Sequence, residues 1–272
     1  MSPVRTAQDS GLASTTYGED GPRLVLLHGL FGQGRNFTQV AKALATEARV
    51  TLVDLPDHGR SPWSGSFSYT AVADQVADHL ATLALGERWT VVGHSMGGKV
   101  AMLVALRHPG LVERLCVVDI APGTSSAVSG FGTYVEAMRA VDLATLTDRS
   151  GAEAVVADRV PDRSVRGFLL QNLRREGSGE SARWRWQMNL DLLGDRLPDI
   201  AGWPDGPLGT YEGPVLWLAG ATSPYVQASS APAMRALFPR VRLVRVKGAG
   251  HWVHADQPEV FVSALRRFLE AA

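Results

Sequence analysis

Six short runs of apolar residues recur along the chain, and each is too short to form a buried helix. They are rich in Val, Leu and Ile, as are strands that are buried on both faces of a parallel sheet. The runs are RLVLLHG (23–29), RVTLVDL (49–55), WTVVG (89–93), LCVVDI (115–120), PVLWLAG (214–220) and VRLVRV (241–246). Between them lie stretches with helical spacing, at 37–45, 69–83, 99–109, 231–238 and 258–271. This alternation predicts an α/β fold with a mostly parallel central sheet, helices on both faces, and ligands at the carboxyl ends of the strands.

One long segment, 124–207, interrupts the alternation with a mostly helical pattern. It begins after the run that contains Asp119 and ends before PVLWLAG, so we expect it to stand over the strand ends as an inserted helical cap. The predicted organisation is therefore a core domain made of residues 1–123 and 208–272, with the cap inserted between its two parts.

Composition excludes several classes of function. The chain has 27 basic and 27 acidic side chains and a formal net charge of zero, whereas proteins that bind nucleic acids or anionic lipids usually carry a basic excess. It lacks an uninterrupted apolar run of about 18 residues, which a membrane-spanning helix would need. Its first residues also lack the apolar stretch of a secretory signal. We therefore expect no nucleic-acid partner, no membrane insertion and a cytoplasmic location.

The first chemical signature is Gly-x-Ser-x-Gly at GHSMG (93–97). It directly follows an apolar run and directly precedes a helical stretch, which is the context that a nucleophile elbow requires. Gly93 and Gly97 leave room for a sharp turn that lifts the hydroxyl of Ser95 clear of the backbone. Ser95 is therefore the candidate nucleophile, and its alternative role is to cap the helix that follows.

A phosphate-binding pattern overlaps this motif. GHSMGGK (93–99) matches G-x-x-x-x-G-K, and LCVVDI has the form of the acidic strand of a nucleotide-binding protein. However, Val100 stands where that pattern needs a Ser or Thr to hold magnesium. We therefore interpret the motif as the site of a nucleophilic Ser95 and not as a phosphate-binding loop.

A serine hydroxyl needs a base to remove its proton, and the chain has seven histidines. His251 lies in KGAGHWVH (247–254) after the last apolar run, where two glycines permit a loop that returns over the strand ends. We predict that His251 is the base, with His254 as the alternative. The His-x-x-His spacing lacks the glutamate of a zinc helix, so we predict no metal.

The base needs a carboxylate that fixes its tautomer and stabilises the imidazolium. The loop after PVLWLAG, at 221–227, contains no carboxylate, whereas Asp119 lies near the end of LCVVDI. The order Ser95, Asp119, His251 is also the chain order of this type of catalytic sheet. We predict Asp119 as the acid, and Asp54 near the end of RVTLVDL is its rival.

Acyl transfer also needs two backbone donors for the oxyanion that forms on the acyl carbon. One should be the N–H of Met96, directly after the nucleophile. The other should come from the sharp turn after the first apolar run, and we assign it to Leu30, with Phe31 as the near alternative.

Together these motifs resemble the α/β-hydrolase superfamily. The matching phrases are HGLFG (28–32), DLPDHGRS (54–61), GHSMGG (93–98), VVDIAP (117–122), AGATSPYV (219–226) and GAGHWVHADQP (248–258). Within the superfamily the chain looks most like the small YbfF-type esterases and their mitochondrial abhydrolase relatives, which share phrases similar to FLLQNL (168–173) and WRWQMNLDLL (184–193).

This resemblance implies an α/β-hydrolase fold and hydrolysis of carboxylic esters or thioesters without a metal or organic cofactor. It places nucleophile, acid and base on Ser95, Asp119 and His251. Ser223 stands where many other members carry their aspartate, which agrees with an acid at the end of LCVVDI.

The sequence predicts a serine esterase for small to medium acyl groups, with an acyl-enzyme intermediate. A C–C bond hydrolase or a cofactor-free perhydrolase would use the same triad, and a non-catalytic binding protein would use the same fold. Aromatic residues in the cap and beside the motifs are candidates for substrate contact, although cap residues also need to dock on the core. The candidates are Phe31, Phe131, Tyr134, Trp186, Tyr225 and Trp252. The oligomeric state is not predicted.

Overall fold

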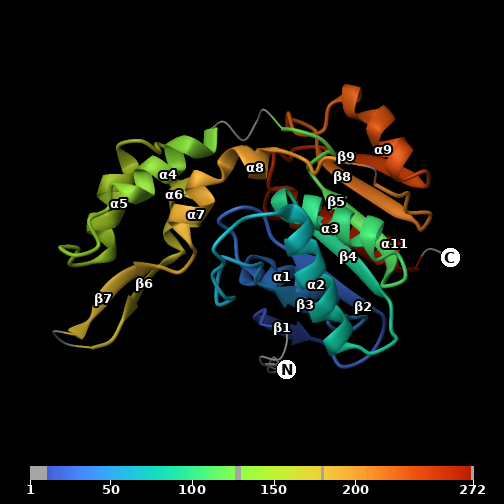
Figure 1. The fold of residues 1–272 in the computed structure, drawn as a ribbon, viewed down its shortest axis with the longest axis horizontal. Helices are drawn as coiled ribbons and strands as arrows, with labels where there is room; N and C mark the ends of the chain where they lie inside the picture. Colours follow the sequence, from blue (N-terminus) through green and yellow to red (C-terminus); the bar gives the residue numbers. More distant parts are fainter. Residues whose placement is uncertain (1–10, 126–129, 179–180, 207, 271–272) are drawn as a thin grey trace.

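The computed structural model describes residues 11–125, 130–178, 181–206 and 208–270. Within them, seven strands form one sheet in the order β1-β3-β2-β4-β5-β8-β9, and every neighbouring pair is parallel except β1 with β3. The strands are β1 (Ser14–Tyr17), β2 (Arg23–Leu27), β3 (Arg49–Val53), β4 (Trp89–His94), β5 (Val112–Val118), β8 (Val215–Gly220) and β9 (Val241–Val246). This mostly parallel sheet, with helices between its strands, confirms the predicted fold class (Figure 1).

Helices cover both faces of the sheet. One face carries α2 (Tyr69–Leu83), α3 (Met96–Arg107) and α9 (Ala231–Leu237), and the other carries α1 (Thr38–Leu44) and α11 (Pro258–Glu270). In β2, Val25 and Leu27 join the hydrophobic core under α2 and α3. Leu24 and Leu26 join the core under α1 and α11. Successive side chains of a strand point to opposite faces, so a strand that is apolar at every position fits between two layers of helices.

The edge strands depart from the sequence prediction. The run 241–246 was expected to be buried on both faces, but β9 lies at the edge of the sheet, and Leu243 and Val244 are 44% and 43% exposed. An edge strand has a neighbouring strand on one side only, and helices cover the faces of β9 less than those of the central strands. The apolar sequence of β9 does not indicate this position in the sheet. At the opposite edge, β1 is short and polar, and it pairs antiparallel with β3. Its sequence, STTY, carries no strand signal of the kind found in the six runs.

Residues 124–207, here called the cap segment, follow β5 and precede β8 in the chain. Their described part forms a layer of its own beside the main sheet (Figure 1). Their helices are α4 (Phe131–Arg139), α5 (Arg149–Ala157), α6 (Arg163–Leu170), α7 (Leu190–Asp195) and α8 (Leu197–Ala201). The segment also contains an antiparallel hairpin of β6 (Leu173–Glu176) and β7 (Arg183–Trp186), which projects away from the main sheet in Figure 1. The expectation of a helical cap therefore needs correction, because RWRW at 183–186 alternates with the period of a strand.

Three side chains tie the cap segment to the carboxyl ends of β2 and β4. Lys99 Nζ donates hydrogen bonds to the carbonyl oxygens of Ala201 (2.7 Å) and Gly202 (2.5 Å), at the end of α8 where helix carbonyls lack partners. Tyr69 Oη donates to the carbonyl oxygen of Ile200 at 2.7 Å. On the other side, the Asn172 amide donates to the carbonyl oxygen of Phe31 at 2.8 Å. These bonds hold α8 and the end of α6 over the strand ends.

Candidate active site

Ser95 occupies a sharp turn between β4 and α3. Its φ of 53° and ψ of −120° lie in a region that L-residues rarely adopt. The turn is possible because Gly97 has no Cβ: a Cβ there would lie 2.5 Å from the carbonyl oxygen of Leu27 and closer still to that of His28. The nucleophile elbow predicted from Gly-x-Ser-x-Gly is thus the geometry that the structure has, and Ser95 remains 8% exposed at the mouth of the sheet.

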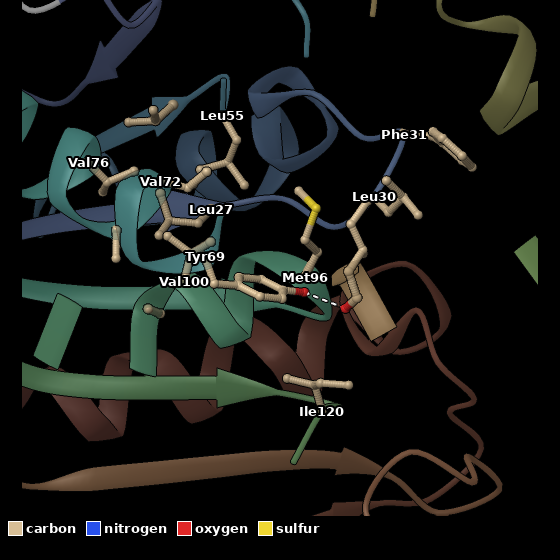
Figure 2. Close-up of a cluster of buried hydrophobic side chains, with 14 of the residues drawn as sticks. Leu27, Leu30, Phe31, Leu55, Tyr69, Val72, Val76, Met96, Val100 and Ile120 are labelled. Carbon is tan, nitrogen blue, oxygen red and sulfur yellow. Dashed lines mark hydrogen bonds between the residues drawn. The ribbon is translucent and has the colours of Figure 1, made fainter. Parts of the chain in front are cut away.

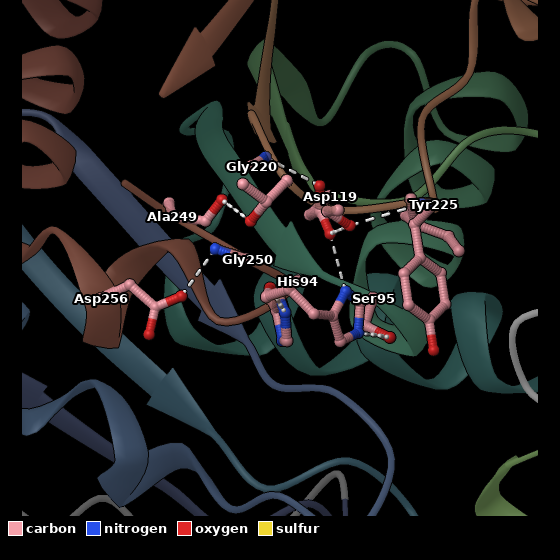
Figure 3. Close-up of polar contacts among 12 residues, drawn as sticks. His94, Ser95, Asp119, Gly220, Tyr225, Ala249, Gly250 and Asp256 are labelled. Atoms are coloured by element: carbon pink, nitrogen blue, oxygen red, sulfur yellow. Dashed lines mark hydrogen bonds and ion pairs between the residues drawn. The ribbon is translucent and has the colours of Figure 1, made fainter. Parts of the chain in front are cut away.

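His251 reaches Ser95 from the loop after β9. Gly248, with a φ of 72°, turns that loop back over the strand ends. The Nε2 atom of His251 lies 3.0 Å from Ser95 Oγ, and Nδ1 lies 2.7 Å from Asp119 Oδ2 (Figure 3). An Nδ1–H that donates to Asp119 leaves Nε2 free to accept the Ser95 proton. The ring of Tyr225 stacks on the imidazole, with 3.9 Å between centroids, and restrains its tilt.

Asp119 lies fully buried directly after β5. Its Oδ1 accepts a hydrogen bond from the Gly220 N–H at 2.9 Å, while Oδ2 accepts from the Ser223 hydroxyl and from His251. These donors satisfy a charge that would otherwise be costly to bury. The rival acid, Asp54, accepts from the backbone N–H groups of Gly34 (2.7 Å) and Arg60 (2.9 Å) instead. Its contacts organise the loop after β3.

The alternative base, His254, faces the hydrophobic core of the α1 side. Its ring lies 4.5 Å from that of Phe37, and burial lowers its pKa to about 4. His94 lies between the two candidates, and its Nε2 donates to the carbonyl oxygen of His251 at 2.8 Å. Burial, with the nearby His251, holds the pKa of His94 well below its ordinary value. His94 therefore fixes the backbone of the His251 loop, whereas His254 makes no hydrogen bond to Ser95 or Asp119.

The two residues predicted to supply backbone N–H donors, Leu30 and Met96, lie beside Ser95 in the structure. Both line the same pocket as Ser95, and Figure 2 shows their side chains in one cluster of buried apolar residues. In the described part of the chain neither N–H donates to another group. The alternative donor, Phe31, is occupied, because its N–H donates to His58 Nε2 at 3.2 Å. Of the two backbone donors that the sequence offered, the Leu30 N–H is therefore available to a substrate, whereas the Phe31 N–H is already hydrogen-bonded.

Two buried histidines shape the loop that presents Leu30. His28 Nε2 accepts from the Leu55 N–H at 3.0 Å, and its Nδ1–H donates to the Gly29 carbonyl at 2.9 Å. His58 makes the corresponding pair of bonds, with the Phe31 N–H and the Pro56 carbonyl. Burial lowers the pKa of His28 to about 4 and that of His58 to about 3, so both rings are neutral at neutral pH.

Backbone strain also gathers at these loops. Among the described residues, the non-glycine residues with positive φ are Phe31 (61°), Asp57 (65°), Ser95 (53°) and Asp119 (51°). Such conformations cost of order 1–3 kcal/mol each and persist where the surroundings impose them, most often at functional sites. Asp57 lies on the loop that His58 closes, so all of these positions belong to the loops at the strand ends.

A narrow space, here called the inner pocket, adjoins Ser95 on the side of α2 and α3. Its ceiling is α8, held by the bonds from Lys99 and Tyr69 to the backbone at 200–202. Burial lowers the pKa of Lys99 to about 8. The lining residues are Leu30, Tyr69, Ser95, Met96, Lys99, Ile120, Phe131 and Ile200.

A second space, the outer cleft, opens on the other side of Ser95, toward α1 and α10 (Val253–Asp256). Phe168 of α6 and Trp252 form an aromatic contact in its wall, with 5.9 Å between ring centroids. The side-chain walls also include Asn36, Phe37 and His254.

The six aromatic candidates for substrate contact divide by position. Phe131 and Trp252 line the spaces beside Ser95. Tyr225 stacks on His251, and Tyr134 contacts Phe131 with 5.4 Å between centroids. Phe31 is fully buried beside Phe131.

Trp186 is not brought to the site. It pairs with Leu173 on the hairpin and packs in the core of the cap segment. Conversely, Phe168 and Asn172 reach the site region from within FLLQNL. Phe168 is among the apolar cap residues that the sequence offers for lining a pocket, whereas Asn172 had no assigned role. His58 likewise lay within DLPDHGRS without an assigned role.

Within the described residues, no three or more His, Cys, Asp or Glu side chains are grouped as metal ligands. The helices of that same part of the chain also include none with the length and apolar character that crossing a membrane requires.

Comparisons with known proteins identify the family. A family model described as alpha/beta hydrolase fold matches residues 22–258. The sn-1-specific diacylglycerol lipase ABHD11 of Danio rerio is 39% identical over 98% of this chain and 85% of its own length. Esterase YbfF of Escherichia coli K12 is 33% identical over 90% of this chain and 92% of its own length.

Among solved structures, a marine microorganism esterase superposes with a TM-score of 0.90 at 33% identity, covering 94% of this chain and 98% of its own. The resemblance to YbfF-type esterases is thereby confirmed. The chain belongs to the alpha/beta hydrolase fold family.

Proposed function

We propose that this protein is a serine esterase that cleaves carboxylic esters through Ser95, His251 and Asp119. One observation carries the proposal: an unbroken line of hydrogen bonds runs from Ser95 Oγ through the imidazole of His251 to the buried carboxylate of Asp119. The assignment as a carboxylic ester hydrolase also agrees with the relatives, which are named as esterases and lipases.

The first half of the reaction follows from this geometry. As Ser95 Oγ bonds to the acyl carbon, its proton moves to Nε2 of His251. Asp119 stabilises the resulting imidazolium through Nδ1–H. The acyl oxygen becomes an oxyanion and accepts hydrogen bonds from the N–H groups of Leu30 and Met96.

Collapse of this tetrahedral intermediate breaks the ester C–O bond. His251 gives its proton from Nε2 to the departing alcohol oxygen, which leaves the acyl group on Ser95. A water molecule then repeats the attack, with His251 as base, and releases the carboxylic acid and free Ser95. Each step uses protons and atoms of the substrate, the chain and water alone.

The preferred acyl group is small to medium in size. The inner pocket is narrow, and the aromatic ring of Tyr69, the Lys99 side chain and the end of α8 line it and are held by hydrogen bonds. A pocket bounded by fixed groups rejects a chain that exceeds it, because the extra methylenes have nowhere to pack.

Pre-steady-state hydrolysis of p-nitrophenyl butyrate tests this proposal. We expect a burst of p-nitrophenol equal to the enzyme concentration, which reports acyl-enzyme formation. Ser95→Ala and His251→Ala should each lower kcat by a factor of about 10³ or more. Ser229→Ala, at an exposed serine outside the site, is the matched control and should behave as wild type. Full turnover by Ser95→Ala, or a rate that peaks only on long-chain lipid esters, would contradict the proposal.

A further inference from the structure

An apolar groove of about 720 Å³ lies on the surface between α1, α11 and the α6 end of the cap segment. The sequence predictions gave it no role. Its floor is formed by Val40, Ala43 and Val262, and its rim is polar. Apolar concavities of this size on a protein surface usually bind a ligand.

The groove adjoins the outer cleft at Ser95. Asn36, Phe168, Trp252 and His254 line both spaces. The Phe168 and Trp252 rings, 5.9 Å apart, stand at the junction. A molecule bound at Ser95 can therefore extend past these two rings into the groove.

The direction of proton transfer decides whether the acyl half or the alcohol half of an ester extends toward the groove. In the proposed mechanism His251 must give its proton to the departing alcohol oxygen, so the alcohol half has to leave on the side of His251. Trp252 follows His251 directly in the chain, and the groove begins at Trp252. The acyl half then faces the narrow inner pocket, which Tyr69 and the end of α8 line.

The charged residues along the groove restrict the kind of alcohol that can bind there. Asp256 and Glu259 lie on its rim. The guanidinium of Arg266, the basic residue of the lining, is paired with Glu47 at 2.9 Å. A leaving group with phosphates, such as coenzyme A, would meet these two carboxylates, while the arginine among the lining residues already faces Glu47.

We propose that this groove binds the alcohol half of the substrate, and that the substrates are short-chain acyl esters of uncharged, lipophilic alcohols. This inference rests on the proposed esterase function and assigns its two substrate sides: a narrow pocket for the acyl group and a large apolar groove for the alcohol.

Two ester series separate the two sides. The first keeps the acetyl group and lengthens the alcohol from ethyl to hexyl, and the second keeps ethanol and lengthens the acid from acetate to octanoate. Because a buried methylene gives a severalfold gain in binding, we expect kcat/KM to rise by about tenfold or more from ethyl to hexyl acetate. In the second series kcat/KM should fall beyond butyrate.

Substitutions on the groove floor test its location. Ala43 and Ala255 line the groove and are exposed, so Ala43→Trp and Ala255→Trp fill it without overpacking the core. Each should lower the ratio of hexyl to ethyl acetate kcat/KM by about tenfold. Ala71→Trp, at an exposed alanine of α2 outside both spaces, is the matched control and should leave the ratio unchanged.

The outcomes distinguish this inference from the proposed function. If Ser95→Ala removes hydrolysis but kcat/KM is the same for ethyl and hexyl acetate, the groove assignment fails and the esterase stands. The assignment also fails if the gain with length appears in the acid series, if coenzyme A thioesters exceed the acetates, or if the tryptophan variants match Ala71→Trp. If Ser95→Ala hydrolyses hexyl acetate as well as wild type, the proposed function fails.

Discussion

Replacing Gly97 by alanine tests how closely α3 must approach the loop that carries Leu30. The added Cβ would lie 2.5 Å from the Leu27 carbonyl oxygen and closer still to that of His28. Real Cβ atoms do not approach backbone atoms this closely, so either the first turn of α3 or the loop after β2 must move by roughly 1 Å.

Such a movement has two measurable costs. Overpacking against backbone destabilises a fold by about 1–3 kcal/mol, against an intrinsic helix gain of about 1 kcal/mol for alanine over glycine. Displacing the Leu30 N–H from the oxyanion removes a donor that is worth about 10²–10³ in kcat. We therefore expect Gly97→Ala to lower the urea midpoint and to reduce kcat on p-nitrophenyl butyrate by about 10² or more.

Gly167 supplies the matched control, because it lies in α6 with open space around its Cβ position. Gly167→Ala should raise stability by about 0.5–1 kcal/mol through helix propensity, with wild-type kcat. Wild-type stability and kcat in Gly97→Ala would refute the argument, since they would mean that the helix and the loop do not touch.

Three further predictions follow from single contacts. Asp119→Asn should reduce kcat by orders of magnitude through the wrong His251 tautomer, whereas Asp54→Asn should cost far less, as steady-state kinetics on folded protein would show. Burial lowers the pKa of His28 and His58 from 6.5 to about 4 and about 3, so the unfolded state binds more protons below pH 6.5. Stability should thus fall by about 1.4 kcal/mol per histidine between pH 7.5 and 5.5, and equal urea midpoints at the two pH values would contradict this. Asn172→Leu leaves the Phe31 carbonyl unpaired and should cost about 1–3 kcal/mol, and an unchanged thermal unfolding midpoint would contradict this.

The features that the sequence predicts are those with a local cause. A strand apolar at every position lies between helix layers, and Gly-x-Ser-x-Gly makes a turn between strand and helix wherever it follows such a strand. The strand ends of a parallel sheet meet at one edge, so Ser95, Asp119 and His251 were expected together before any distance was known.

The features that the sequence does not predict depend on distant partners. Asn172 bonds to Phe31, 141 residues away, and Ser223 bonds to Asp119, 104 residues away. No periodicity encodes such pairs. The hairpin of the cap segment has the same origin, because its two short strands become a sheet only where Leu173–Glu176 pairs with Arg183–Trp186. Trp186 was predicted to contact substrate only because it is aromatic. The pairing of its strand with Leu173–Glu176 places it in the core of the cap segment instead.

The central claim is that Ser95 is a nucleophile activated by His251, and covalent labelling with a fluorophosphonate probe tests it most directly without knowledge of the substrate. The protein and Ser95→Ala are treated side by side, and the products are read by intact mass and by the modified peptide. We predict one adduct per chain on Ser95 and none on the variant. Folded wild-type protein that takes up no probe, or an adduct that persists in Ser95→Ala, would contradict the account.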